Sequence, residues 1–177
     1  MTKLNESEEY PSDWQSVEEG KSEGSEFLKI KSGEKVRLRI LSGPLAFQQL
    51  YLEGGKRGYN LPHGAQLPGY KLRKQYAFEV LILDGISAGD HKIWAAGQKV
   101  AEQLSQIRTE WGDIKKCDIV LSKSCEKLET KWQATPVPPT KLTETEVAPT
   151  LKLAEKIMYA TKEELNAIPP APVGAVA

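Results

Sequence analysis

The sequence predicts a mainly β protein, a small barrel with one helix, and three observations support this fold class. Apolar and polar residues alternate with a period of two over several short segments, which is typical of half-buried strands. Between residues 98 and 111 the apolar spacing changes to three and four, which predicts an amphipathic helix. Turns that contain glycine or proline separate these segments.

The first expected strand covers residues 35–41 and has one apolar and one cationic face. The apolar face carries Val36, Leu38 and Ile40, and the opposite face carries Lys35, Arg37 and Arg39. The Ser-Gly-Pro sequence at residues 42–44 is expected to end this strand. A second alternating segment, residues 46–52, places Phe47 and Tyr51 on the face opposite Leu50.

A long loop follows, from Gly54 to about Leu72, and loops of this length inside a compact domain are often functional. Residues 75–83 and 91–95 then predict a hairpin, because two apolar strand patterns flank the Asp-Gly turn at residues 84–85.

The apolar face of the expected helix carries Val100, Leu104, Ile107 and Trp111. Gly112 is expected to end the helix, and strand patterns return over residues 118–122 and 127–134. Beyond Pro139, the capping boxes Thr143-x-x-Glu146 and Thr161-x-x-Glu164 predict two short helices.

In this order of elements the helix lies between the third and the fourth principal strand. That order is typical of the OB fold, a five-stranded Greek-key barrel, although another small β-barrel with one helix would have it too. We therefore divide the chain into a flexible acidic arm (residues 1–24), an OB-fold nucleic-acid-binding domain (25–138), short C-terminal helices (139–168) and a disordered Pro/Ala-rich tail (169–177).

The formal net charge of zero conceals two charged blocks. Residues 1–26 hold eight acids and two bases, a balance of −6, whereas residues 27–74 hold ten bases and two acids, a balance of +8. A basic block of this size suggests a polyanionic partner. A solvated basic surface that is balanced by the acidic arm is the alternative.

Several classes of protein are not expected. The longest apolar runs have about five residues, and the acidic N-terminus lacks the apolar stretch of a signal peptide, so we expect a cytoplasmic protein without a membrane partner. Two cysteines are too few for a disulfide framework or a zinc site. The sequence has no nucleophile, phosphate-loop or metal-ligand signature, so no enzyme activity, cofactor, metal or small-molecule substrate is expected.

An ordered set of segments carries a family resemblance. The run from Ser25 to Leu41 follows an acidic stretch and contains Phe-Leu-Lys and Val-Arg-Leu-Arg-Ile. Further segments match in order at residues 75–80, 93–100, 111–119 and 132–136. Over about residues 10–168, the chain resembles phage single-stranded DNA-binding proteins related to the T-even phage helix-destabilising protein. Some of those proteins carry a cysteine-rich zinc subdomain in the long loop, but this loop has no cysteine and a single histidine, His63.

The resemblance implies a sequence-tolerant protein that coats and protects single-stranded DNA during phage-type replication, recombination or repair. Replication or recombination proteins are then possible further partners, and the cytoplasm of a bacterial host is the expected location of a phage-encoded chain.

Binding to single strands requires cations that follow the phosphates and aromatic rings that stack on unpaired bases. The expected cationic residues are Arg37, Arg39, Lys56, Arg57, Lys71, Arg73 and Lys74. The expected stacking residues are Phe47, Tyr51, Tyr59 and Trp94. Two alternatives stay open at this point: a β-barrel adapter that contacts other proteins of a replication complex, and an RNA-binding OB protein.

The acidic arm is expected to fold over the basic groove and to compete with DNA. Deletion of residues 1–24 should then raise the affinity for oligo-dT and steepen its dependence on salt. Tryptophan fluorescence titrations over a series of salt concentrations measure both quantities. Unchanged binding would exclude the competition.

Overall fold

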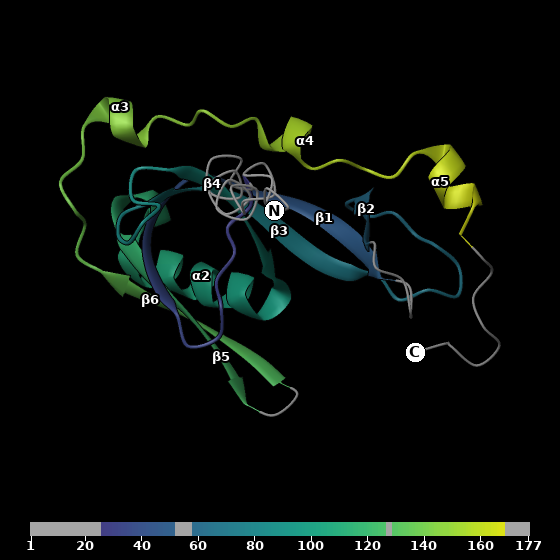
Figure 1. Cartoon of the computed structure of the whole chain (residues 1–177), viewed down its shortest axis with the longest axis horizontal. Coiled ribbons are helices and arrows are strands. Elements are labelled where there is room, and N and C mark those ends of the chain that lie inside the picture. The colour runs from purple at the N-terminus through teal and green to yellow at the C-terminus, as the bar shows by residue number, and fades with distance from the viewer. Residues whose placement is uncertain (1–25, 52–57, 127–128, 169–177) are drawn as a thin grey trace, which may run out of the picture.

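The computed structural model describes residues 26–51, 58–126 and 129–168. The expected arm (residues 1–24) and tail (169–177) lie outside these ranges. Within them, six antiparallel strands form one open sheet in the order β4-β3-β1-β5-β6, with β2 paired to one end of β1 (Figure 1). The prediction of a mainly β protein is confirmed.

The elements follow the expected order, except that β2 lies within the expected loop of residues 54–72 and that η2 and α4 are additional. The strands are β1 (Lys35–Tyr51), β2 (Gly58–Pro62), β3 (Arg73–Ile82), β4 (His91–Gly97), β5 (Asp118–Glu126) and β6 (Glu129–Val137). The helices are α2 (Gln98–Trp111), the 3-10 helix η2 (Ile114–Lys116), α3 (Glu144–Val147), α4 (Leu153–Lys156) and α5 (Lys162–Asn166). Both predicted capping boxes form, at the starts of α3 and α5.

The long strand β1 organises the sheet. It pairs with β3 from Leu38 to Gln49, while its other edge pairs first with β5 and then with β2. The two strands expected over residues 35–41 and 46–52 are therefore one strand, and the prediction that residues 42–44 end it is wrong. These residues form an irregularity in the β1–β3 register instead, which bends β1 without interrupting it.

Glycine is required at the bend. Gly43 has a φ of 107°, and a Cβ atom added there would lie 2.7 Å from the carbonyl oxygen of Ala77. The Ser-Gly-Pro sequence at residues 42–44 thus does change the backbone, but it produces an irregularity within β1 rather than a chain reversal.

The main core lies between one face of the sheet and α2. The helix has the predicted bounds, ends at Gly112 with a φ of 82°, and buries Val100, Leu104 and Ile107. The sheet contributes alternating residues of the four strands β1, β3, β4 and β5, among them Leu38, Ile40, Phe78, Val80, Trp94, Ile119 and Leu121.

The opposite face of the sheet is covered by the C-terminal segment, residues 138–160, which we call the C-terminal strap. Figure 1 shows α3 and α4 of this segment on one side of the sheet and α2 on the other. Ile157 of the strap forms a second, smaller core with Phe47, Ala77 and Ile93. At the far end, the Ala160 N–H donates to the carbonyl oxygen of Asn60 in β2, at a distance of 2.8 Å.

A buried carboxylate also holds the strap. Glu79 of β3 is fully buried and accepts hydrogen bonds from the backbone N–H groups of Thr150, at 2.9 Å, and of Leu151. The ring of His91 lies on the same carboxylate, with 3.6 Å between Nδ1 and Oε2. The strap therefore supplies backbone hydrogen-bond donors to the buried carboxylate of Glu79.

The sheet does not close in the part of the chain that the structure describes. No ladder joins β4 to β6, so these are the two edge strands, and only an isolated bridge between Phe27 and Ile93 touches the β4 edge. The closed five-stranded barrel expected from the sequence is not confirmed. No helix among the described residues combines the length and apolar composition needed to cross a membrane.

Truncation of Ile157 tests how much the strap contributes to stability. Ile157→Ala should lower the free energy of unfolding by about 2–5 kcal/mol, because the side chain is 2% exposed and packs in the second core. Met158→Ala is the matched control, since this neighbouring side chain is 81% exposed and should change stability by less than about 0.5 kcal/mol. Urea denaturation measures both values, and equal effects would show that the strap is not docked through Ile157.

Candidate nucleic-acid interface

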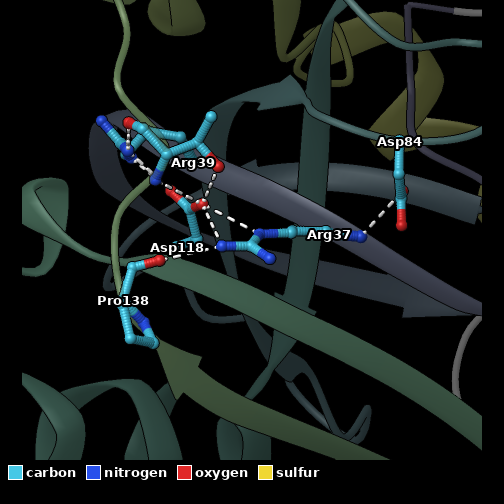
Figure 2. A network of polar contacts seen from close by, with 6 residues as sticks. Arg37, Arg39, Asp84, Asp118 and Pro138 are labelled. Atoms are coloured by element: carbon cyan, nitrogen blue, oxygen red, sulfur yellow. Dashed lines mark hydrogen bonds and ion pairs between the residues drawn. The ribbon is translucent and has the colours of Figure 1, made fainter.

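Arg37 and Arg39 do not form the exposed cationic face that the sequence predicts. Both side chains turn to the fully buried carboxylate of Asp118, as Figure 2 shows. Nε of Arg37 lies 2.9 Å from Oδ2, and Nε of Arg39 lies 2.8 Å from Oδ1. Arg39 is buried and Arg37 is partly exposed, so the expectation of free guanidinium groups is wrong for Arg39 above all.

The two arginines also hold the start of the C-terminal strap. Arg37 donates to the carbonyl oxygen of Pro138 at 2.8 Å, and Arg39 donates to that of Thr140 at 2.7 Å. Thr140 in turn donates to Asp118 through its backbone N–H and its hydroxyl, at 2.9 and 2.6 Å. These contacts bury Arg39 and use Nε and Nη2 of Arg37, whose side chain stays partly exposed.

Opposing effects act on the pKa of Asp118. Burial alone would raise it, but the hydrogen bonds from Thr140, Arg39 and Arg37 together hold the pKa below the ordinary aspartate value of 3.8. Asp118 is therefore a charged structural group at neutral pH.

Two of the expected stacking residues are buried. Phe47 is 2% exposed because the strap covers it, and Trp94 is 2% exposed because its side chain points into the main core, with its ring centroid 5.6 Å from that of Phe78. The predicted exposed position is wrong for both rings. The sequence pattern identified the faces of the strands but not the segments that cover them.

The remaining expected residues fall into two groups. Tyr51 is 55% exposed at the end of β1 and packs beside Gly58, and Tyr59 is partly buried on β2. Lys56 and Arg57 lie outside the described residues.

Lys71, Arg73 and Lys74, by contrast, come together as expected, and all three are exposed. They line a cleft of about 930 Å³ together with Lys99 of α2, which the sequence analysis did not select. We call this the basic cleft. It lies where the start of β3 and the last residues of β4 (Ala95–Gly97) meet the first turn of α2 and Trp132 of β6.

The charged side chains that line the basic cleft all have the same sign. Among the described residues that line it, four are cationic and none is acidic. The first turn of α2 also has no acidic residue, and Gly97 provides no side-chain cap, so its backbone N–H groups add to the positive potential. An anion in the cleft would relieve the repulsion among these like charges.

Trp132 gives the cleft an aromatic wall. Its side chain is partly buried, and Nζ of Lys123 lies 5.2 Å from the ring centroid. The amide of Gln103 fixes the backbone around it, because Nε2 donates to the Trp132 carbonyl at 3.0 Å and Oε1 accepts from the Ala134 N–H at 2.9 Å. The apolar face on which Trp132 lies in the sequence predicts a core position, and the ring does pack against the main core. That it also lines the cleft depends on the open edge between β4 and β6.

No group of three or more His, Cys, Asp and Glu residues in the described ranges could hold a metal ion. Comparisons of the chain with protein-family models, with curated proteins and with solved structures give no match.

Asp118→Asn tests the structural role of the arginine pair. The substitution leaves two guanidinium groups beside a neutral amide, and we expect it to lower the free energy of unfolding by about 3–5 kcal/mol at neutral pH. Because the folded-state pKa of Asp118 lies below its ordinary value, the stabilisation by the carboxylate is complete above that value and is lost as the pH falls through the lower folded-state pKa.

The difference in stability between wild type and variant should therefore be constant from pH 7 to roughly pH 5 and shrink in more acidic solution. Urea denaturation at a series of pH values measures it. A difference that is small at pH 7, or that grows on acidification, would contradict this role.

Proposed function

We propose that the protein binds single-stranded DNA in the basic cleft, without a strong preference for sequence. The observation that carries the proposal is the combination of four cationic residues, no acidic residue among the described lining, and the indole of Trp132. The cations would hold successive phosphates, and the indole would stack on an unpaired base, an interaction that contributes roughly 1–3 kcal/mol. No bond is made or broken, so the site needs no catalytic residue.

The strand connections support the same function. β1 pairs with β3 and β5, β3 pairs with β4, and β5 pairs with β6, while α2 connects β4 to β5. We infer an OB-type barrel in which the closing pair, β4 with β6, is open. OB proteins bind oligonucleotides across their second and third strands, between the loop that joins the first two strands and the loop that joins the last two.

The position of the basic cleft agrees with that rule. The second and third barrel strands correspond to β3 and β4, whose ends line the cleft. Lys71 comes from the end of the first of the two loops, and Trp132 lies on the final hairpin. The family resemblance of the sequence adds the biological setting, the protection of exposed strands during phage-type replication, recombination or repair.

Charge reversal at the cleft tests the proposal. The double variant Arg73→Glu, Lys74→Glu should weaken binding to oligo-dT by tenfold or more and reduce the salt slope by about 0.7 for each phosphate that the variant no longer neutralises. The matched control is Lys115→Glu, Lys116→Glu, a pair of adjacent exposed lysines that follow α2 and do not line the cleft.

Tryptophan fluorescence titration at several salt concentrations measures both variants against the wild type. Equally weakened binding in the two variants would assign binding to overall charge rather than to the cleft, and no binding by the wild type at micromolar concentration would exclude the function. Competition with RNA and with duplex DNA of the same length distinguishes the ligand classes, because phosphate contacts and stacking alone do not separate DNA from RNA.

A further inference from the structure

A second pocket lies beside the basic cleft. It has a volume of about 460 Å³, within the range of about 300–1,000 Å³ typical of small-ligand sites. Gln48 of β1 forms one wall, and residues 65–68, Tyr70 and Leu72 of the loop before β3 form the other. Its lining combines an aromatic ring, apolar side chains and amides, and holds no charged residue among those described.

Gln48 carries an unusual polar group in this wall. Its Oε1 atom is hidden from solvent and has no hydrogen-bond partner among the described residues. An acceptor left in this state loses the hydrogen bonds it would make in water, which is unfavourable for the unbound protein. The terminal torsion of a glutamine side chain is broad, so a rotation about it can turn Oε1 into the pocket.

The pocket and the basic cleft adjoin each other. Leu72 lines both of them. Gln48 is also the direct cross-strand neighbour of Lys74, which places their side chains on the same face of the sheet with Cβ atoms roughly 4.5–5.5 Å apart. A strand whose phosphate lies at Lys74 therefore has a base within reach of the pocket.

We propose that this pocket receives one unpaired base of the strand bound in the basic cleft, with Gln48 Oε1 accepting a hydrogen bond from an N–H group of the base. The inference rests on the proposed function. The ring of Tyr70 and the side chain of Leu72 supply the apolar surface against which the base lies. Only a base that is not paired can enter, so the pocket selects single strands over duplexes.

The test compares oligo-dC, whose bases present an amino group, with an abasic oligomer of the same length and charge. Gln48→Leu should weaken binding to oligo-dC by roughly 3- to 10-fold, the effect of one hydrogen bond, and leave binding to the abasic oligomer unchanged. The melting temperature should stay the same or rise, because the substitution removes an unpaired acceptor. Gln48→Met, with an unbranched side chain of similar length, provides a second variant, and Gln106→Leu, an exposed position on α2 outside both pockets, is the matched control.

Each outcome distinguishes the base pocket from the proposed function. Weaker binding confined to oligo-dC in both Gln48 variants, with Gln106→Leu unchanged, supports the base pocket. Gln48 variants that bind oligo-dC as the wild type does would overturn the base pocket and leave binding in the cleft intact. Equal affinities of the wild type for the two oligomers would overturn both the base pocket and the stacking on Trp132, and would leave only the phosphate contacts of the cleft. A wild-type protein that binds neither oligomer would overturn both proposals.

Discussion

The fully buried carboxylate of Asp118 is the constraint on which the rest of the structure depends. It lies at the start of β5, receives the side chains of Arg37 and Arg39 from β1, and accepts two hydrogen bonds from Thr140 at the start of the C-terminal strap. A buried charge without such partners would be strongly unfavourable. Because these contacts bury Arg39 and use part of the donors of Arg37, the proposed binding of DNA relies mainly on other cations.

Both faces of the sheet are covered by other elements in the part of the chain that the structure describes. The helix α2 covers one face, and the strap, anchored at Asp118, Glu79 and Ile157, covers the other. The basic cleft lies in the gap between β4 and β6, where its exposed cations and the indole of Trp132 come together. The same division separates the charges, because the buried acids lie under the strap while exposed lysines and Arg73 gather at the open edge.

The sequence predicts those features that local patterns determine. The spacing of Val100, Leu104 and Ile107 identified α2, and charge selected Lys71, Arg73 and Lys74, which the structure brings to one cleft. Alternation also assigned residues to faces correctly, but it does not say what covers a face. Phe47 was expected to be exposed because the strap that buries it comes from more than a hundred residues later in the chain. The contact of Trp132 with the cleft could not be predicted for the converse reason, since the open edge between β4 and β6 is a property of the whole sheet.

The proposed cleft and base pocket would contribute to binding in different ways, and their combination would explain sequence tolerance together with preference for single strands. Phosphate contacts release counterions, so the contribution of the cleft weakens as salt rises, whereas a hydrogen bond and stacking in an uncharged pocket do not depend on salt in this way. The proposed pocket would hold a single base, and every base presents at least one N–H group on its pairing edge. Oε1 of Gln48 would therefore distinguish an unpaired base from a paired one more strongly than it distinguishes one base from another. Such a protein would recognise whether the bases are paired rather than their sequence, which is the property required to coat exposed DNA.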